Sequence, residues 1–461
     1  MSGPRIATDW VPEGMEELFF LPDPMVPAQA TCYWDLGNRH LGGGSPRHRT
    51  SPSTLRARAL RLADHGGGRL VLISDAIEHL PPGEDNSDAE EQEATLLEAR
   101  RLASYLAPRG VRINICRVGY CPALGHRLPE AELRHLRSFL AIRRDVTRDD
   151  LAATIRFLAQ GPENLVGETL TLDGGLSWPL VRAGSGSSRT AVFEPEPGGP
   201  RQEDETVLVT GASSKIGRAI VERLADQGCS LVLSGRSEDN LTELAGAVRE
   251  RGLPCRIVPA DLSQPGGAEQ LWAELAATPV TGVVYGAGAL QLDPPSSAHE
   301  RQQLFQLNHL SWATLAELAA ESWRAAERPG ALVALGSLSA DTVAGPRLAS
   351  YAASKAAMVQ QTSYLAVTYG RYGIRAGAVL PGGVADTTMA REQHDSYLEA
   401  AVERVPTGRF STPDEVAAVV SYLLRPGSAM LAGRPVRLCG GVSTLRPAPP
   451  VPLPHVKEYA S

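Results

Sequence analysis

Cysteine and long apolar runs are scarce in this chain of 461 residues. Its six cysteines follow no regular framework, which is typical of a reducing cytoplasm rather than of a disulfide scaffold. No run of about 18 or more apolar residues occurs, so we expect no membrane span. The N-terminus carries acidic residues and prolines where a signal peptide needs a basic start and an apolar core. The sequence therefore predicts a cytoplasmic protein without a membrane partner.

A basic surface and a metal motif are missing as well. The net charge is −7 and the sequence pI is about 5.9, which argues against a nucleic-acid partner held through phosphate contacts. Cys116 and Cys121 lie close together, but no His or Cys pair nearby completes a zinc pattern, so we expect packing residues and no metal site. Lysine is present only at Lys215, Lys355 and Lys457.

The length exceeds one ordinary core and predicts two domains. Residues 1–30 hold prolines without periodicity and should form an extended or disordered arm. Residues 179–205 are rich in Gly, Ser, Pro and acidic side chains, which is typical of a linker. Residues 446–461 form a proline-rich tail. Two folded parts remain, 31–178 and 206–445.

The two parts repeat each other in three separate blocks at a nearly constant offset of 262 to 266 positions. Such a steady offset indicates an internal duplication. The first copy is shorter ahead of its first matching block, so we expect it to lack most of the opening strand–helix–strand unit. The matching pairs are Arg69–Asp75 with Ala331–Ser337, Gly110–Arg112 with Gly373–Arg375, and Asp149–Gly175 with Asp414–Gly441.

A glycine turn opens the second copy. Thr206–Thr210 is a β-branched apolar run that predicts a buried strand, and the turn Gly211–Gly217 leads into an amphipathic helix. This order aims a helix N-terminus at a pyrophosphate, with Gly211 for the tight turn and Gly217 for close backbone approach. Taken alone, the same pattern also fits an ordinary turn between a strand and a helix.

The next two strands add features of a dinucleotide site. Cys229–Leu233 leads to Arg236, where an arginine accommodates a 2′-phosphate and favours NADPH over NADH; a solvated arginine is the alternative. Arg256–Leu262 predicts a third strand, which would bring Asp261 and Leu262 beside the adenine. A fourth strand, Thr281–Leu290, ends in small residues that would let a cofactor pass.

Tyr351 and Lys355 are four positions apart in a segment that predicts a helix, so they share one face. They follow the strand that ends at Ser337, and Asn308 lies further upstream. Ser339 is an alternative to Ser337, with an equally acceptable spacing to Tyr351. Tyrosine has an ordinary pKa of about 10, so acid–base chemistry at neutral pH requires a neighbouring positive charge such as Lys355.

These motifs together resemble the short-chain dehydrogenase/reductase family. Thr210–Gly217 resembles its cofactor loop Thr-Gly-x-x-x-Gly-x-Gly, and Tyr285–Gly288 stands where the family has Asn-Asn-Ala-Gly. Two departures are present: Lys215 replaces the middle glycine, and both asparagines of the second motif are missing. Lys215 either adds charge near the phosphates or is a solvated side chain.

The resemblance implies a doubly wound parallel α/β sheet of the Rossmann type and a set of catalytic residues. Tyr351 would protonate a carbonyl oxygen, Ser337 would hold that oxygen, Lys355 would bind the ribose and lower the tyrosine pKa, and Asn308 would support a water. Thr387 or Thr388 would bind the nicotinamide amide or the phosphates. The implied cofactor contacts are Gly211, Ser213, Ser214, Lys215, Ile216, Gly217, Arg236, Asp261, Leu262, Ala287, Gly288, Tyr351, Lys355, Pro381, Gly382, Val384 and Thr387.

In the first copy the serine, tyrosine and lysine positions become Asp75, Asp88 and Gln92, and no glycine turn precedes them. We expect no dinucleotide there. Its carboxylates suggest either a metal or acid–base site or a solvated acidic loop. The whole chain resembles the high-molecular-weight type of 3-oxoacyl-acyl-carrier-protein reductase, in which a degenerate N-terminal domain precedes the ketoreductase. This implies a homodimer in which each chain mimics a family dimer.

The resemblance implies an NADPH-dependent reductase of a β-ketoacyl or polyketide-like ketone, free or bound to a carrier. Two other functions fit the same sequence. One is a cyclase, dehydratase or epimerase that uses Tyr351 for proton transfer without redox chemistry. The other is a non-catalytic partner of another reductase, against which the intact Ser337, Tyr351 and Lys355 argue.

Overall fold

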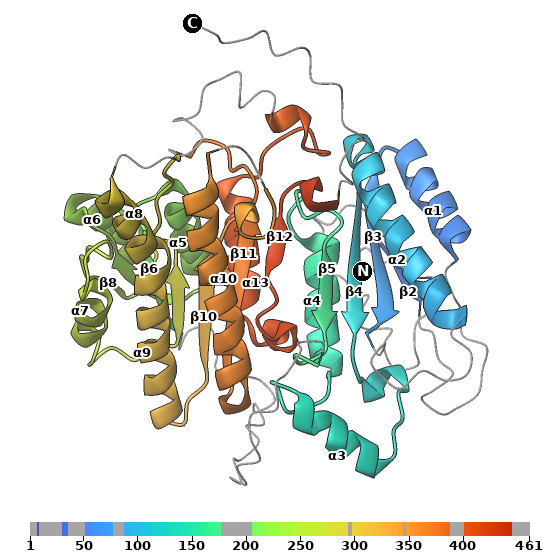
Figure 1. Cartoon of the computed structure of the whole chain (residues 1–461), viewed down its shortest axis with the longest axis horizontal. Coiled ribbons are helices and arrows are strands. Elements are labelled where there is room, and N and C mark those ends of the chain that lie inside the picture. Colours follow the sequence, from blue (N-terminus) through green and yellow to red (C-terminus); the bar gives the residue numbers. More distant parts are fainter. Residues whose placement is uncertain are drawn as a thin grey trace, which may run out of the picture.

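The computed structural model describes residues 7–8, 30–35, 51–76, 87–176, 205–293, 297–343, 347–387 and 401–444. Thr388, Lys457, the tail, nearly all of the linker and the side chain of Asp88 lie outside the described residues. The described residues form two parallel sheets side by side, one from each half of the chain (Figure 1).

The sheet of the C-terminal half has seven parallel strands in the order β12-β11-β10-β9-β6-β7-β8. This order is that of a Rossmann-like doubly wound sheet and confirms the predicted fold. Because the chain reverses direction across the sheet between β6 and β9, a ligand crevice is expected at their carboxyl ends. The strands are β6 Thr206–Thr210, β7 Ser230–Ser234, β8 Cys255–Ile257, β9 Gly282–Tyr285, β10 Gly330–Leu335, β11 Ile374–Pro381 and β12 Val436–Leu438.

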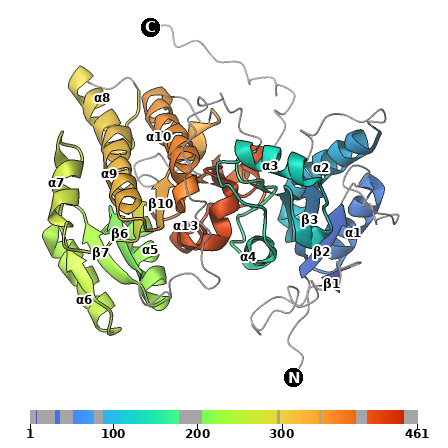
Figure 2. The same ribbon diagram turned by 90° about the horizontal axis from the view of Figure 1, so that it is seen from below.

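Helices cover both faces of this sheet (Figure 2). Val207 and Val209 of β6 pack with α5, α6 and α13, whereas Leu208 packs with α7, α9 and α10 on the other face. This alternation follows from the two-residue period of a strand. The helices are α5 Lys215–Asp226, α6 Glu238–Arg249, α7 Gly267–Glu274, α8 Ala298–Phe305, α9 Ser311–Ala325, α10 Ala349–Tyr369 and α13 Pro413–Leu424.

The third strand is shorter than the sequence predicts. β8 ends at Ile257, so Asp261 and Leu262 lie in the turn that follows and not at a strand end. The Asp261 carboxylate accepts hydrogen bonds from the backbone N and the hydroxyl of Ser263, at 3.0 and 2.7 Å. Such a local side-chain bond gives the backbone an alternative to the ladder of an edge strand.

The N-terminal half forms a five-stranded parallel sheet in the order β1-β2-β3-β4-β5. On one side of β3 the sheet continues with β2 and then β1, as on one side of β10 it continues with β9 and then β6. Part of the segment predicted as an arm therefore joins the sheet, because β1 lies within it; a two-residue strand is too short to show a period in the sequence. The strands are β1 Ala7–Thr8, β2 Ala30–Asp35, β3 Gly68–Asp75, β4 Val111–Val118 and β5 Thr169–Leu172, and the helices are α1 Pro52–Asp64, α2 Ser87–Leu106, α3 Glu130–Phe139 and α4 Arg148–Gln160.

The two halves pack through α4 and β5 on one side and α13, β12 and the 3₁₀ helix η8 (Pro426–Leu431) on the other (Figures 1 and 2). The rings of Phe157 and Tyr422 stack with centroids 4.0 Å apart and planes at 4°. These two residues are 265 positions apart and occupy matching places in the repeat. Residues that meet their own counterparts are typical of a two-fold interface.

Two backbone hydrogen bonds across the same interface are reciprocal. Gly174 N donates to Met430 O at 3.0 Å, and Gly440 N donates to Asn164 O at 2.9 Å. Both donors and both acceptors are 266 positions apart. Each half therefore donates to the other at the same place, so the two halves contact each other as two copies related by an approximate two-fold axis do.

Candidate active site

The glycine turn between β6 and α5 depends on its first glycine. Gly211 has φ +64°, and a Cβ on it would lie 2.6 Å from Gly286 O. Ser214 caps α5, since its hydroxyl accepts a hydrogen bond from Gly217 N at 3.0 Å. Lys215, which departs from the family motif, is the exposed first residue of α5 and has no left-handed backbone that would require glycine.

The second departure from the family motif is explained by packing. Tyr285, at the end of β9, is fully buried, donates a hydrogen bond to Leu307 O at 2.6 Å and lies against Trp312. Burial raises the pKa of Tyr285, so its hydroxyl stays protonated. The turn after it is held by Thr210, whose hydroxyl accepts from the backbone N of Gly286 and Ala287 at 3.2 and 3.3 Å.

Asn308 links this turn to α10. It lies in a π-helical turn, Gln306–Leu310, which is a common device at functional sites. Its amide donates to Ala289 O at 2.9 Å and to Ser354 Oγ at 3.0 Å, and its Oδ1 accepts from Ala289 N at 2.9 Å. Asn308 therefore sets the separation between the loop after β9 and the helix that carries Tyr351 and Lys355.

Lys355 is buried beside the carboxyl ends of the central strands. Its Nζ donates to Leu335 O, the last residue of β10, at 2.9 Å. Burial lowers the pKa of Lys355 to about 8. A Cβ at Gly288 would lie 3.1 Å from Lys355 Nζ and 3.2 Å from Asn308 Oδ1, so these two polar groups converge on one exposed glycine.

Tyr351 lies one turn before Lys355 on α10 and is also buried. Burial raises its pKa, and hydrogen bonding with Ser337 acts in the opposite direction. In the chain without a cofactor, the pKa of Tyr351 is therefore raised and not lowered as expected, because burial has the largest effect. Of the two candidate serines, Ser337 is the one whose hydroxyl acts on the pKa of Tyr351; it also accepts from Ser339 N at 3.2 Å.

The segment expected along the nicotinamide begins at the end of β11, which Pro381 closes. Gly382 N donates to Leu438 O at 2.9 Å. Val384 forms an isolated parallel bridge with Ser411, and Thr387 Oγ1 donates to Val384 O at 3.0 Å. This segment is thus held on both sides, by β12 and by the chain that precedes α13.

The residues expected around the adenine lie in the segments that follow β6, β7 and β8. Ser213 lies in the glycine turn near Gly235, and Ile216 is half-buried in the first turn of α5. Arg236 and Asp261 are exposed; the hydrogen bond from Ser263 lowers the pKa of Asp261 most, and the positive charge of Arg236 adds a smaller lowering. Leu262 is buried, and its carbonyl accepts from Ser311 Oγ at 2.7 Å.

The chain's own residues therefore fit a nicotinamide dinucleotide. A capped helix N-terminus follows the glycine turn, an exposed arginine follows the second strand, and Lys355 and Asn308 flank an exposed glycine. The structure also adds two residues that the sequence interpretation did not single out: Thr210 and Ser354. Ser354 stands between Tyr351 and Lys355 in the sequence, so its position was available as a signal.

The corresponding edge of the N-terminal half is filled by its own side chains. Asp75 is buried and lies 3.2 Å from His126 Nε2, while His126 Nδ1 accepts from Cys121 N at 3.1 Å. The Gln92 amide donates to Ser74 Oγ and, at 3.1 Å, to Asp75 O. Asp75 is therefore part of a buried pair, and the expectation of a solvated carboxylate is wrong for it.

Cys116 and Cys121 are buried in the core of the same half. Among the described residues, no three His, Cys, Asp or Glu side chains gather in a way that could hold a metal ion. Within the same ranges, no helix combines the length and the apolar character that crossing a membrane demands.

Comparison with known proteins agrees with the fold. A family model described as enoyl-(acyl carrier protein) reductase matches residues 211–443. The short-chain dehydrogenase/reductase eriH of Hericium erinaceus is 32% identical over 242 residues, which are 51% of this chain and 96% of that protein. The (3R)-3-hydroxyacyl-CoA dehydrogenase of Mus musculus is 30% identical over 254 residues, 52% of this chain and 97% of that protein.

Among solved structures, a provisionally assigned NAD(P)-dependent gluconate 5-dehydrogenase from Beutenbergia cavernae, with NADP bound at low occupancy, is similar. It is 29% identical with a TM-score of 0.50, over 52% of this chain and 98% of that chain. The family model, the relatives and the seven-stranded sheet agree on the same half of the molecule. This chain therefore belongs to the short-chain dehydrogenase/reductase family of nicotinamide-dependent oxidoreductases.

Proposed function

We propose that the C-terminal half reduces a ketone to an alcohol with NADPH. The observation that carries the proposal is the convergence of four side chains at the carboxyl ends of β9 and β10. Tyr351 meets Ser337, while Lys355 Nζ and Asn308 Oδ1 both lie beside Gly288. A glycine turn and a capped helix stand next to them, where a dinucleotide would bring its nicotinamide to the same point.

The four residues would divide the work as follows. Ser337 donates a hydrogen bond to the substrate carbonyl oxygen and fixes its place, and Tyr351 gives that oxygen a proton. Lys355 holds the ribose hydroxyls and supplies positive charge, while Asn308 keeps the loop after β9 at its distance from α10 and supports a water that returns the proton. The bound cofactor supplies the hydride. Because burial by the protein raises the pKa of Tyr351, the tyrosine is kept in its protonated form, which is the form that donates.

NADPH is favoured over NADH by Arg236, which is exposed after β7 where a 2′-phosphate would lie. The NADP bound to the similar Beutenbergia cavernae protein supports this choice. We place the further cofactor contacts at the predicted positions, including Val384 and Thr387 in the segment after β11.

We propose a β-ketoacyl or polyketide-like ketone as the substrate class. The similarity to a (3R)-3-hydroxyacyl-CoA dehydrogenase supports an acyl substrate, since the reverse of that chemistry reduces a β-ketoacyl thioester. The family description, enoyl-(acyl carrier protein) reductase, also names an acyl chain.

We further propose that the N-terminal half, 31–178, is a degenerate copy that stands in for a second subunit. The order of its strands, the stacked Phe157 and Tyr422, and the reciprocal backbone bonds support a duplication. Two chains would then pair as a homodimer through the long helices, where α2 exposes Leu97 and Tyr105 and α10 exposes Tyr364. Sedimentation equilibrium would test this, and a monomer at micromolar concentration would contradict it.

The experiment that tests the function is a fluorescence titration of NADPH and NADH on the wild type, Arg236→Ala and Arg223→Ala. Arg223 is an exposed arginine at the far end of α5 and serves as the matched control. We expect Arg236→Ala to weaken NADPH binding about tenfold, the loss of one charge-assisted hydrogen bond, and to leave NADH unchanged.

Arg223→Ala should bind both nucleotides as the wild type does. Absence of binding of either nucleotide by the wild type would overturn the proposal. Equal binding of both nucleotides by the wild type would overturn only the preference for NADPH.

A further inference from the structure

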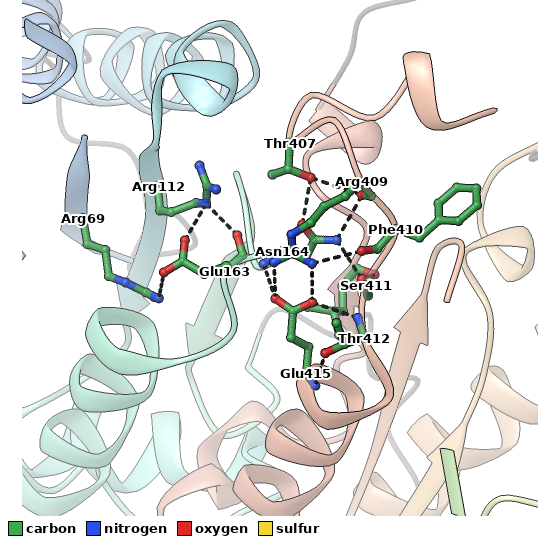
Figure 3. Close-up of polar contacts among 11 residues, drawn as sticks. Arg69, Arg112, Glu163, Asn164, Thr407, Arg409, Phe410, Ser411, Thr412 and Glu415 are labelled. Carbon is green, nitrogen blue, oxygen red and sulfur yellow. Dashed lines mark hydrogen bonds and ion pairs between the residues drawn. The ribbon is translucent and has the colours of Figure 1, made fainter. Parts of the chain in front are cut away.

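Asn164 is a residue of the N-terminal half whose polar groups are used by the C-terminal half. It lies in the loop between α4 and β5 and is 1% exposed. Figure 3 shows its side chain pointing away from its own sheet, into the chain that runs from Thr407 to Glu415. A buried amide is stable only where its donors and acceptors are satisfied, so the contacts it makes there fix its place.

Both the backbone and the side chain of Asn164 take part. Its N donates to Glu415 Oε1 at 2.9 Å, and its O accepts from Gly440 N at 2.9 Å. Its Oδ1 accepts from Thr407 Oγ1 at 2.7 Å, and its Nδ2 donates to Ser411 Oγ at 3.0 Å and to Arg409 O at 3.3 Å. The side-chain amide of Asn164 therefore holds the segment Thr407–Ser411 at Thr407, Arg409 and Ser411.

That segment lies next to the proposed nicotinamide site. Ser411 N donates to Gly383 O at 2.9 Å, and Ala385 N donates to Ser411 O at 2.9 Å. The turn Gly383–Ala385 directly follows Pro381–Gly382, and Thr387 bonds back to Val384 in the same segment. Asn164 is thus two hydrogen-bonded steps from the residues expected to contact the nicotinamide.

A comparison of the two halves shows that packing between them does not require an amide at the position of Asn164. Arg409 pairs with Glu415 through two bonds of 2.8 and 2.9 Å, and 265 positions earlier Arg144 pairs with Asp150 through two bonds of 2.5 and 2.8 Å. The residue that matches Asn164 is Met430, which keeps the reciprocal backbone bond but has an apolar side chain. Both halves therefore have the pair between an arginine and the acidic residue of the helix cap. The side-chain amide of Asn164 has no counterpart in the other half, and it bonds only to the C-terminal half.

We propose that Asn164 is a positioning residue for the reaction in the other half of the chain. By holding Thr407–Ser411, it fixes the turn Gly383–Ala385 and so the residues that receive the nicotinamide. This inference rests on the proposed function. It gives the N-terminal half a role in the active site beyond that of a packing partner.

The test compares two ligands on three variants of the full chain. NADPH carries the nicotinamide, and 2′-phospho-ADP-ribose carries everything else, so an effect at the nicotinamide end changes only the first affinity. Asn164→Leu removes all three side-chain hydrogen bonds, and Thr407→Val removes the one at 2.7 Å. Thr154→Val is the matched control, because it removes a buried interface bond of 2.8 Å to Tyr422 far from this turn.

We expect Asn164→Leu to weaken NADPH binding about tenfold, since several buried hydrogen bonds are lost, with the fragment affinity within about twofold of wild type. Thr407→Val should show the same selectivity to a smaller extent. Thr154→Val should lower the melting temperature without changing either affinity. If Asn164→Leu does not fold, Thr407→Val carries the test.

Three outcomes would overturn the inference. Folded variants at 164 and 407 could bind NADPH as the wild type does, or they could lose both ligands equally, or Thr154→Val could lose NADPH to the same extent. A wild type that binds neither ligand would overturn the proposed function itself and this inference with it. The two failures are therefore distinguishable by the wild-type titration alone.

Discussion

The carboxyl ends of the two sheets lie in matching places and hold opposite kinds of polar group. In the N-terminal half, Asp75 Oδ1 lies 3.2 Å from His126 Nε2 and the Gln92 amide donates to Asp75 O, so side chains of this half fill the edge. In the C-terminal half, Lys355 Nζ donates to a backbone carbonyl, and a glycine leaves the space beside it open. The comparison teaches that one strand arrangement can be either a packed core or a site, according to a few side chains at its edge.

The largest effect is expected on turnover, when the proton donor of the C-terminal edge is removed. Tyr351→Phe keeps the ring but loses the proton donor, so we expect kcat to fall roughly 10²- to 10⁴-fold, the usual contribution of a general acid. NADPH affinity should stay within about threefold, since the ring still packs on α10. The measurement is turnover on the best ketone from a screen of β-ketoacyl thioesters, combined with NADPH titration.

The matched control is Tyr369→Phe at the far end of the same helix, where the hydroxyl donates to Glu321, and it should turn over as the wild type does. Near-normal turnover by Tyr351→Phe would contradict the role of Tyr351 as the proton donor. The non-redox alternatives would not gain from that result, because they use the same tyrosine.

The sequence predicted the C-terminal half well because its signals are local. A strand, a glycine turn and a helix of ordinary length occur in one short stretch, and Tyr351 and Lys355 share a helix face by their spacing alone. The same approach missed Asn164, because its partners lie more than 200 positions away and a single asparagine has no period. It also missed β1, and it placed Asp75 in solvent because its partner His126 is 51 positions away.

The second prediction concerns the contact between the halves. Tyr422→Ala removes the ring that stacks on Phe157 and accepts or donates a bond with Thr154, so we expect it to lower the free energy of unfolding by about 3 to 5 kcal/mol. Urea denaturation would measure this. Val343→Ala, at a side chain that is 94% exposed, should change it by less than about 1 kcal/mol. Equal losses in the two variants would mean that the halves are not held by this pair.

The third prediction uses a buried carboxyl of the N-terminal half, Glu168. Burial raises its pKa to about 7, against the opposing charge of Arg437 at 3.6 Å; Asp341 raises it further and Arg100 lowers it. Because the folded protein keeps a proton that the unfolded chain loses near pH 4.5, stability should fall as the pH rises from about 4.5 to about 7. The loss amounts to at most about 3 kcal/mol.

Glu168→Gln removes this loss, so it should gain stability relative to the wild type between pH 5 and pH 8. Denaturation at the two pH values measures the gain. Glu130→Gln is the control, because Glu130 and its partner Arg134 are both mostly exposed, and such pairs are worth less than about 1 kcal/mol. If the free energies of unfolding of Glu168→Gln and wild type differed by the same amount at both pH values, the prediction would be contradicted.

The smallest effect is expected from the two helix caps that stand at matching positions of the two halves. Thr147 caps α4 and Thr412 caps α13, each through a capping box with the acidic residue three positions on. Replacing either threonine by alanine should cost about 1 kcal/mol of stability, because the two caps are built alike. Only Thr412→Ala should also weaken NADPH binding, by roughly twofold, since Glu415 of that box holds Asn164 and a disturbed cap costs a fraction of one hydrogen bond. Paired denaturation and titration of the two variants would separate the shared structural role from the one-sided functional role. An equal loss of NADPH affinity in Thr147→Ala would show that the caps act through the stability of the interface and not through the turn that Asn164 holds.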